Sequence, residues 1–384
     1  MKKLKQKVLI ISHDASPGGA QNSILNLSKI LNSLDFELYI ILKKEGGLKE
    51  EFDKLGMCFV WNKVNLSNSN IFIKGFNKLI NLNQLLNSII LKKINAKSPE
   101  ICISNTIANH EIVKNFNNQK LKIITWVHEL NYMFKVAEKV SLERPKEIIK
   151  STNFFLCASK AVQKHLIDSY KIPIDKTYVI YEIISDQEPK NIVKENICFK
   201  VGGCGAIGWR KGSDIFLNLA NEIVNVMNLR DISFEWLGSH KDSIGLLQFE
   251  QEVKKLNLEK HVIAKPFSNN SNEFMKSINL FLMTSREDPF PLVNLEAGLN
   301  KSPILCFSGT GGSEEYALKD NIFKYGDIVS MGKRVKFYKE NLSLLAQDAK
   351  QSKQNASQFT KQFKTKEVEE LIMNLPWATY KINT

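Results

Sequence analysis

Residues 284–298 read Thr-Ser-Arg-Glu-Asp-Pro-Phe-Pro-Leu-Val-Asn-Leu-Glu-Ala-Gly. The run just before them, residues 278–283, has the apolar content of a buried strand, and the two prolines predict a turn after it. A helix can begin at Leu292, which places Asp288 in the loop and Glu296 in the first turns of the helix. Open α/β sheets bind ligands at the carboxyl ends of their strands. The stretch therefore predicts a strand–loop–helix unit with two carboxylates at a ligand site, or a plain connection with solvated acids.

The same alternation of apolar runs and helical segments continues along the whole chain. Continuous apolar strands separated by helices are typical of a parallel sheet that is covered on both faces. The expected strands cover residues 7–12, 38–42, 58–61, 101–104, 123–127 and 154–158 in the first half, and residues 197–201, 234–237, 262–264, 279–283 and 304–307 in the second. We therefore expect an α/β protein of two doubly wound, Rossmann-like domains that face each other across a cleft.

The two series of strands set the expected domain boundaries. A chain of 384 residues is too long for one compact core, so two domains are expected. An N-terminal domain would cover residues 1–185 and a C-terminal domain residues 197–360, joined by a polar linker over residues 186–196. Residues from about 340 onward read as helical, with a polar part at 351–358 that suits a loop or an exposed helix face. Residues 361–384 would form a helical segment that can cross back to the first domain.

The composition is that of an ordinary globular protein, with 43% hydrophobic and 24% charged residues. No run of eighteen apolar residues occurs, and the apolar residues 8–11 are too few for a signal peptide. The six cysteines are scattered without a Cys-x-x-Cys pair, which indicates reduced, mostly buried thiols and neither disulfides nor zinc. Together these features predict a cytoplasmic protein.

Positive charge is concentrated in the first half of the chain. Of the net charge of +13, residues 1–190 carry +10, because 28 Lys and Arg face 18 Asp and Glu. Such a surplus suits an anionic partner, namely a membrane surface, a phosphorylated substrate or nucleic acid, or serves solubility alone. The cations do not alternate with aromatic residues, which argues against single-stranded nucleic acid. Residues 71–97 read as a basic amphipathic helix that either lies on a membrane or packs on its own sheet.

A glycine loop follows the first strand of the second half. Gly203-Cys-Gly-Ala-Ile-Gly208 matches the dinucleotide fingerprint G-x-G-x-x-G, and Glu235 in the next strand suits a ribose-binding acid, so a nicotinamide enzyme is one interpretation. The residues that follow delay the helix to Ser213 or Asp214. A long glycine loop that ends in Arg210 and Lys211 suits a diphosphate held by cations and backbone amides. An exposed turn is the remaining alternative.

Further glycines and one histidine follow other strands. The segment Gly309-Thr-Gly-Gly-Ser-Glu-Glu-Tyr comes after residues 304–307, and Gly18 and Gly19 come after the first strand; at both places backbone amides can approach an anion closely. His128 ends the strand of residues 123–127, where ligand-binding residues gather. The chain has no Asp-x-Asp pair, which is the usual clamp for a metal-bound nucleotide diphosphate, and no Walker A, His-Glu-x-x-His or Gly-x-Ser-x-Gly motif.

Together these segments resemble the family 4 glycosyltransferases, which are retaining enzymes with the two-domain GT-B fold. The resemblance spans almost the whole chain and rests on four segments in family order: residues 12–21, the strand end at His128, residues 203–214, and the acids Asp288 and Glu296. Gly311-Gly-Ser-Glu-Glu315 adds to it. Two features depart from the family pattern. The first acid is commonly Glu, so either Asp288 or its neighbour Glu287 can take that role, and an arginine that is frequent in the glycine loop is missing, since Gly205 and Ala206 stand there.

The resemblance implies transfer of a sugar from a nucleotide-diphosphate donor with retention at the anomeric carbon. It implies catalytic roles for His128, Arg210, Lys211, Asp288 and Glu296, with Glu296 on the ribose and the two cations on the departing diphosphate. Donor contacts are implied for Gly18, Gly19, Gly205, Glu287, Phe290, Gly311, Gly312 and Glu315. No metal and no other cofactor is expected, because two cations and backbone amides can neutralise the leaving diphosphate.

The expected partners are a nucleotide-sugar donor and a glycan or lipid-linked acceptor in cell-surface polysaccharide biosynthesis, without nucleic acid. Contact with an anionic membrane surface is left open, so the protein would be cytoplasmic with an option of peripheral attachment to the inner face of the cell membrane. A nucleotide-sugar epimerase of the same fold and a protein that binds a sugar nucleotide without turnover are the alternatives. The base and sugar of the donor, the acceptor, its linkage and the oligomeric state have no signal in the sequence.

Overall fold

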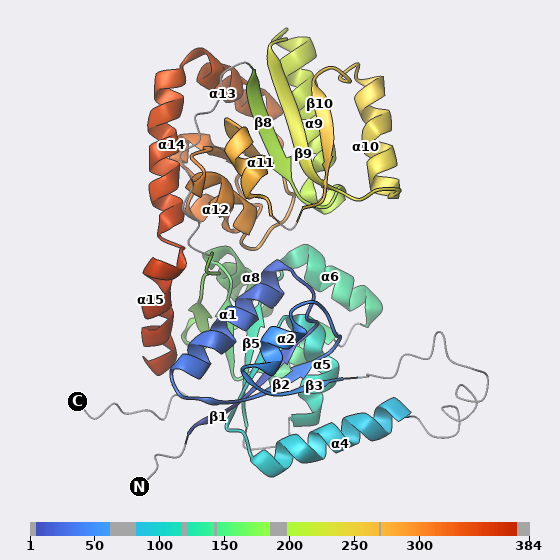
Figure 1. Cartoon of the computed structure of the whole chain (residues 1–384), viewed down its shortest axis with the longest axis vertical. Coiled ribbons are helices and arrows are strands. Elements are labelled where there is room, and N and C mark those ends of the chain that lie inside the picture. Colours follow the sequence, from blue (N-terminus) through green and yellow to red (C-terminus); the bar gives the residue numbers. More distant parts are fainter. Residues whose placement is uncertain are drawn as a thin grey trace, which may run out of the picture. The chain divides into compact units, whose positions relative to one another are not determined.

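The computed structural model of the chain describes residues 5–61, 82–116, 121–141, 144–184, 198–268 and 270–374. The chain divides into two compact units. Unit 1 comprises Met1–Ala158, Val162–Ile180 and Thr365–Thr384, and unit 2 comprises Ser159–Ala161 and Tyr181–Lys364. Each unit is built around one parallel sheet (Figure 1).

Unit 1 contains a sheet of seven strands within the described residues, in the order β3-β2-β1-β4-β5-β6-β7. All neighbouring strands pair in parallel. The strands are β1 (Lys7–Ser12), β2 (Glu37–Leu42), β3 (Gly56–Val60), β4 (Ile101–Asn105), β5 (Lys122–Val127), β6 (Phe154–Cys157) and β7 (Thr177–Val179). The order reverses between β1 and β4, so the carboxyl ends of these two strands form the topological switch point of the unit.

The strands of unit 1 are apolar on both faces, which requires helices on both sides. Leu9 and Ile11 belong to a core cluster that also contains residues of α4 to α8, and Ile10 between them is equally buried. On α1, Ile24, Leu27 and other apolar residues recur at helical spacing and are buried. The helical segments are α1 (Gly19–Ser33), α2 (Lys49–Asp53), α4 (Leu82–Lys97), η1 (Ile107–Asn109), α5 (His110–Val113), η2 (Lys114–Phe116), α6 (Asn131–Val140), α7 (Arg144–Ser151), α8 (Lys160–Tyr170), η3 (Ile174–Lys176) and α15 (Lys361–Asn374).

Unit 2 contains a second parallel sheet, with six strands in the described part of the chain and the order β10-β9-β8-β11-β12-β13. Its strands are β8 (Phe199–Cys204), β9 (Ile232–Ser239), β10 (Val262–Pro266), β11 (Leu280–Met283), β12 (Ile304–Phe307) and β13 (Ile322–Phe323). Counted within the unit, this is the 3-2-1-4-5-6 order of nucleotide-binding Rossmann folds. Its switch point lies between β8 and β11.

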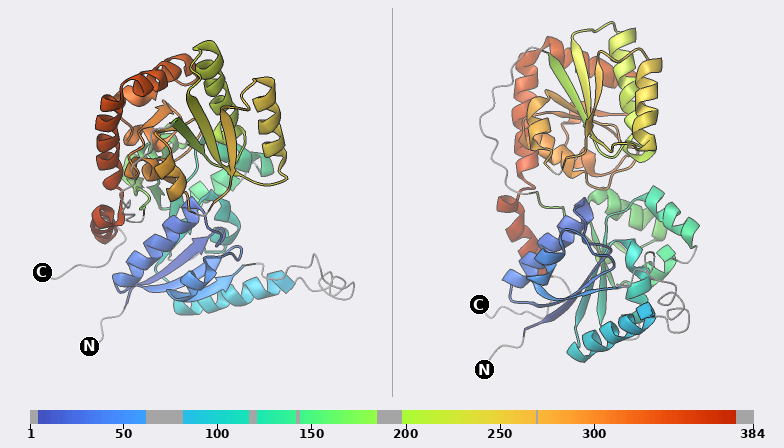
Figure 2. Two further views of the ribbon diagram at one scale, coloured as in Figure 1. Left: turned by 45° about the horizontal axis from the view of Figure 1, so that its top comes forward. Right: turned by 45° about the vertical axis from the view of Figure 1, so that its right-hand side comes forward.

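Helices lie on both sides of the unit 2 sheet (Figure 2). One core cluster joins the strands to α9, α10 and α13 through residues such as Phe216, Trp236 and Val335. The helical segments are η4 (Trp209–Lys211), α9 (Ser213–Asn221), η5 (Glu222–Val226), α10 (Ile244–Lys255), α11 (Asn272–Ser277), α12 (Leu292–Leu299), η6 (Gly312–Glu315), η7 (Lys319–Asn321), α13 (Ile328–Glu340) and α14 (Leu342–Ser357). Side-chain caps begin two of them, since Ser243 accepts from Leu246 N and Asp327 from Ser330 N.

The structure confirms the α/β fold class and corrects details of the strands. The short edge strands β7 and β13 were not expected from the sequence. Strand β8 continues through Gly202 and Gly203 to Cys204, beyond the predicted end at residue 201. A Cβ on Gly202 would lie 2.6 Å from Ile278 Cδ1, and one on Gly203 would lie 2.6 Å from the Trp236 ring. These glycines therefore serve close packing on both faces of the strand and do not yet form the loop.

Two expectations fall partly or wholly outside the described residues. The linker predicted at residues 186–196 lies outside them, and of the basic amphipathic helix predicted at residues 71–97 only α4 is described. On α4, Ile90 and Ile94 are buried in the core of unit 1, whereas Leu85 and Ile89 are 52% and 41% exposed. The polar segment at 351–358 is helical to Ser357, as part of α14. In the described part of the chain, no helix is both long and apolar enough to span a membrane.

Candidate functional site

The switch point of unit 2 brings together two loops that carry predicted site residues. The loop after β8 carries Arg210 and Lys211, and the loop after β11 carries Asp288. Gly212 lies where these loops meet: its φ is +69°, and a Cβ there would lie 1.9 Å from the carbonyl oxygen of Thr284. A side chain would push the loops apart. Glycine at 212 therefore allows the cation-bearing turn to approach the acid-bearing loop.

Both predicted cations bond to the loop after β11. Lys211 Nζ forms an ion pair with Asp288 Oδ2, and Arg210 Nη1 donates a hydrogen bond of 3.0 Å to the carbonyl oxygen of Glu287. Asp288 is only 7% exposed. Gly205 lies beneath the lysine, because a Cβ on it would be 3.0 Å from Lys211 Cγ. Of the two candidates for the first acid, Glu287 and Asp288, the carboxylate that pairs with Lys211 is that of Asp288.

Backbone bonds join Asp288 to the glycines after β12. Asp288 and Gly311 form a parallel β-bridge, and Gly312 N donates to the carbonyl oxygen of Pro289 at 3.0 Å. A Cβ on Gly312 would lie 2.4 Å from that same oxygen. The amide of Gly312 thus already has an acceptor inside the protein, and the glycine permits the tight approach of the two loops around Asp288.

Glu296 lies on α12 near the same edge of the sheet. Its Oε2 accepts a hydrogen bond from Ser271 Oγ. Burial raises the pKa of Glu296, and the bond from Ser271 acts in the opposite direction. Cys204 ends β8 and lies within electrostatic reach of Glu296 and Lys211; burial, together with the charge of Glu296, raises the pKa of its thiol to about 12. The acid, the lysine and the end of β8 are therefore close to one another.

Two predicted donor contacts, Phe290 and Glu315, have partners inside unit 2. Phe290 is 4% exposed and packs against Tyr181 and Tyr316, with ring centroids 5.2 and 5.4 Å away. Glu315 accepts a hydrogen bond of 2.7 Å from the Tyr181 hydroxyl and one of 3.2 Å from Ala161 N. Burial raises the pKa of Glu315, and these bonds lower it. Donor contact by either residue stays a prediction.

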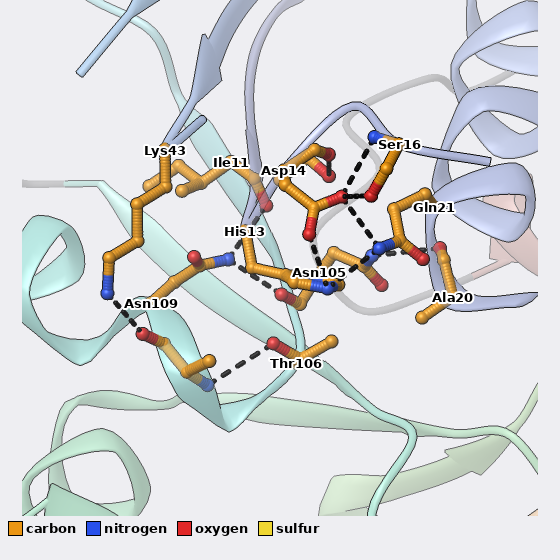
Figure 3. Close-up of polar contacts among 12 residues, drawn as sticks. Ile11, His13, Asp14, Ser16, Ala20, Gln21, Lys43, Asn105, Thr106 and Asn109 are labelled. Atoms are coloured by element: carbon orange, nitrogen blue, oxygen red, sulfur yellow. Dashed lines mark hydrogen bonds and ion pairs between the residues drawn. The ribbon is translucent and has the colours of Figure 1, made fainter. Parts of the chain in front are cut away.

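In unit 1, a polar cluster lies at the switch point (Figure 3). Nearby in the chain, Gly18 caps α1 and Gly19 begins it. Gln21 Nε2 lies 3.0 Å from His13 Nε2 and donates to Asp14 Oδ1 at 2.7 Å. His13 Nε2 also lies 3.5 Å from Asp14 Oδ2. Burial lowers the pKa of His13, and the Asp14 carboxylate opposes the shift.

Two asparagines, one at the end of β4 and one just after it, complete this cluster (Figure 3). Asn105 donates from Nδ2 to the carbonyl oxygen of Ala20 at 2.8 Å. Asn109 donates to the carbonyl oxygens of Ile11 and Asn105 at 3.1 and 2.6 Å. Both side chains are fully buried, and their Oδ1 atoms have no hydrogen-bond partner among the described residues. They tie the ends of β1 and β4 to the start of α1.

Thr106 has a rare backbone conformation at the end of β4, with φ of 73° and ψ of 159°. This region is populated almost only by glycine, so the residue is strained. The Thr106 hydroxyl accepts a hydrogen bond of 3.2 Å from Ala108 N, which helps to begin η1. Such strain at a strand end is frequent beside ligand sites.

His128 follows β5 at the same edge of the unit 1 sheet. Its backbone amide donates to Glu129 Oε2 at 2.9 Å, and Glu129 Oε1 accepts from Ile107 N at 3.1 Å. Burial raises the pKa of Glu129, while His128 and the two amides act in the opposite direction. The centroid of the His128 ring lies 4.8 Å from that of the Trp126 ring. The structure thus gathers His128, Gly18 and Gly19 in unit 1, and the remaining predicted residues in unit 2.

The position of Glu235 removes the support for a nicotinamide enzyme. A ribose-binding acid belongs at the carboxyl end of its strand. Glu235 instead lies within β9, which runs on to Ser239, and it is 4% exposed. Its carboxylate pairs with Lys265 Nζ at 2.7 Å and with Lys200 Nζ at 3.6 Å. Glu235 therefore serves an ion-pair network across neighbouring strands.

Within the described ranges, no group of three or more His, Cys, Asp or Glu side chains is arranged to hold a metal ion. The six cysteines are free thiols, and Cys102, Cys157 and Cys306 are buried. Burial raises the pKa of the Cys157 and Cys306 thiols to about 12. These thiols are packed as small apolar side chains.

Sequence reasoning missed several polar residues at the two switch points. In unit 1 they are His13, Asp14, Gln21, Asn105, Asn109 and Glu129, and in unit 2 they are Asp214, Ser271 and Arg286. A usable signal existed for His13 and Asn105, because a polar residue directly at the end of a parallel strand lies on the ligand edge. Ser271 had no local signal, since its partner Glu296 is 25 positions away.

Comparisons with known proteins agree with this architecture. Residues 184–363 match the family model described as "Glycosyl transferases group 1". A poly(ribitol-phosphate) alpha-N-acetylglucosaminyltransferase of Staphylococcus aureus is 23% identical over 210 residues, which are 53% of this chain and 40% of that protein. The aligned part is thus well under half of the relative's length.

Solved structures resemble the chain over nearly its full length. HepE of Anabaena in complex with UDP gives a TM-score of 0.77 at 18% identity, covering 96% of this chain and 100% of that one. TarM of Staphylococcus aureus gives a TM-score of 0.71 at 13% identity, covering 98% and 100% of the two chains. These likenesses establish the fold. The chain therefore has the GT-B fold, and its residues 184–363 match the model of the group 1 glycosyl transferases.

Proposed function

We propose that this protein is a retaining glycosyltransferase that moves a sugar from a nucleotide-diphosphate donor to a glycan or lipid-linked acceptor in cell-surface polysaccharide biosynthesis. One observation carries the proposal: Arg210 and Lys211 stand together at the switch point of a unit that matches the group 1 glycosyl transferases. Paired cations at a switch point suit a diphosphate. Two relatives support the class of donor, since HepE was solved with UDP-glucose and TarM with UDP.

The proposed chemistry places the charge of Arg210 and Lys211 where it is needed. The bond between the anomeric carbon and the phosphate oxygen breaks, and its electron pair stays on the diphosphate. The acceptor oxygen bonds to the carbon on the same face, and its proton passes to the leaving diphosphate. Negative charge therefore grows on the leaving diphosphate, and fixed cations stabilise it more in the transition state than before. Asp288 would hold Lys211 in place until the donor binds. Glu296 would accept the ribose hydroxyls.

We further propose that the reaction needs no metal ion, because the two cations take the role that a metal has in other transferases. Activity should then persist in excess EDTA. A loss of activity in EDTA that is restored by Mg²⁺ or Mn²⁺ would contradict this part. We also propose that His128 contacts the sugar of the donor. A further proposal is that the basic first unit contacts an anionic membrane surface.

The test begins with a thermal-shift panel of nucleotide sugars that includes UDP-glucose and UDP-N-acetylglucosamine. A donor at a hundred times its Kd should stabilise the folded protein by about 2.7 kcal/mol. Turnover is then measured as release of the nucleoside diphosphate with wild-type protein, Lys211→Ala and Glu296→Gln. Both variants should lose turnover while they keep a folded circular dichroism spectrum. Lys336→Ala is the control, because Lys336 is an exposed lysine on α13.

The same assay separates the alternatives. Near-normal turnover by both Lys211→Ala and Glu296→Gln would contradict the proposed site. An epimerised nucleotide sugar formed without any acceptor would indicate an epimerase of the same fold. Tight donor binding without product across a panel of acceptors would indicate a binding protein.

A further inference from the structure

Arg286 connects the two loops of the unit 2 switch point. It follows β11 by three residues and lies two residues before Asp288. Its Nη1 and Nη2 atoms donate to the two carboxylate oxygens of Asp214 at 2.8 and 2.6 Å, in the first turn of α9. The side chain of Arg286 is 17% exposed. Bidentate bonds of this kind fix the direction of both partners.

Arg286 also holds the turn that carries the two cations. Nη1 donates to the carbonyl oxygen of Trp209 at 2.6 Å, and the backbone amide of Arg286 donates to the carbonyl oxygen of Arg210 at 2.9 Å. The guanidinium carbon lies 5.0 Å from the centroid of the Trp209 ring. Since Trp209 is 56% exposed, this contact covers a ring that solvent would otherwise surround.

We propose that Arg286 is a positioning residue. By bonding both to the carbonyl oxygen of Trp209 and to the carboxylate of Asp214, it clamps the turn Trp209–Lys211, so that Arg210 and Lys211 face the leaving diphosphate. A three-residue turn has few bonds of its own to fix its direction. Asp288 alone would hold only the tip of Lys211. The clamp instead fixes the backbone from which both cations extend. This inference rests on the proposed function, because it assigns the diphosphate to these cations.

Positioning has a distinct kinetic signature. A displacement of about 1 Å in a catalytic group costs up to about a hundredfold in rate. Arg286→Met should therefore lower kcat/KM for the donor by about a hundredfold, mostly through kcat, because the cations act on charge that develops in the transition state. Arg286→Lys keeps the charge but not the bidentate hydrogen bonds to Asp214, so it should restore little of the lost kcat/KM.

Asp214→Asn separates positioning from direct contact. This change leaves Arg286 charged but removes the carboxylate that orients it. If Arg286 acts by positioning, Asp214→Asn should lower kcat/KM by about tenfold, and the double variant with Arg286→Met should be no worse than Arg286→Met alone. If Arg286 touches the diphosphate itself, freeing it from Asp214 should leave UDP affinity unchanged or raise it. That result would overturn the positioning role.

Trp209 supplies a readout that needs no substrate. Trp61, Trp126 and Trp236 are at most 7% exposed, so acrylamide reaches mainly Trp209 once Trp377, outside the described residues, is replaced in a Trp377→Phe background. Arg286→Met should raise the quenching constant, because the ring loses its cover. The matched control is Arg334→Met: Arg334 has the same 17% exposure, pairs with Asp348 at 3.2 Å and lies over the Tyr338 ring, but on α13. It should change neither quenching nor kcat/KM.

The outcomes divide as follows. Higher quenching together with the fall in kcat supports the clamp. A wild-type protein that turns over donor, with Arg286→Met equal to Arg334→Met in kcat/KM, overturns the inference whatever the quenching is. A wild-type protein that neither binds UDP nor turns over UDP-glucose, UDP-N-acetylglucosamine or any other nucleotide sugar of the panel refutes the proposed function, and the clamp's assigned role with it.

Discussion

Glu296 is a half-buried acid whose ionisation costs stability. Burial raises its pKa in the folded protein, so the protonated form is favoured there. The stability gained from the protonated carboxyl group is fully present below the unfolded pKa of about 4.3. It is lost as pH rises through the folded pKa. The proposed ribose contact of Glu296 as a carboxylate would thus come at a cost in stability.

Replacing Glu296 by Gln should therefore stabilise the protein more at high pH than at low pH. The difference in Tm between Glu296→Gln and wild type should grow from pH 4 to pH 8, while donor turnover falls at every pH. Calorimetry across that range measures the first effect. Glu273→Gln is the control, because the Glu273 side chain is 79% exposed. A Tm difference that stays flat or shrinks with pH would contradict the burial argument.

The strained backbone at Thr106 should make a glycine variant more stable than an alanine variant at this position. Thr106→Ala and Thr106→Gly both lose the hydrogen bond from Ala108 N, but only glycine relieves the strained φ of 73°. The glycine variant should be more stable than the alanine variant by about 1–3 kcal/mol. Urea unfolding measures the difference. At Lys92, exposed on α4, the same pair should show the opposite order by about 1 kcal/mol. Equal stability of the two Thr106 variants would show that the strain is absent.

At the scale of elements, the junction of β8, η4 and α9 depends on Gly212. A methyl group at this position would collide with the carbonyl oxygen of Thr284, whereas at Gly309, which has a similar φ of +73°, nothing lies within 4 Å of an added Cβ. Gly309→Ala should therefore cost only the backbone strain, about 1 kcal/mol. Gly212→Ala should cost at least 2 kcal/mol more and should abolish donor binding, because the turn with Lys211 must move. Denaturation midpoints measure the loss of stability in each variant, and a UDP titration measures donor binding. Similar losses of stability for the two variants would contradict the predicted collision at residue 212.

Most strands of both sheets were predictable because each is a continuous apolar run. The edge strands β7 and β13 were not, since they have only three and two residues, too few to form an apolar run that marks a strand. In the candidate site, the sequence indicated Lys211, Asp288 and Glu296 as separate signals. It did not indicate that Lys211 pairs with Asp288, which is 77 positions away, because only the parallel sheet brings those loops together. The role of Glu235 was misread for the same reason: its partners Lys200 and Lys265 lie on neighbouring strands.

At the scale of the whole molecule, each unit has a hydrophobic core of its own. Domains with separate cores can unfold in separate steps. Differential scanning calorimetry should therefore give a calorimetric enthalpy larger than the van't Hoff enthalpy. A donor nucleotide should raise the temperature of one transition and leave the other in place, and Gly212→Ala should lower that same one. A single transition with equal enthalpies, which UDP moves as a whole, would contradict independent units.

The division of the chain between the units has a consequence during protein synthesis. Residues from Thr365 onward belong to unit 1, and Val368 and Ile372 on α15 are 4% and 5% exposed. Unit 2 lies wholly within the stretch that leaves the ribosome before them. A nascent chain can thus close unit 2 while unit 1, whose strands were made first, still lacks part of its apolar cover. The half of the protein that begins first is completed last, and chaperones or premature truncation would act on it most strongly.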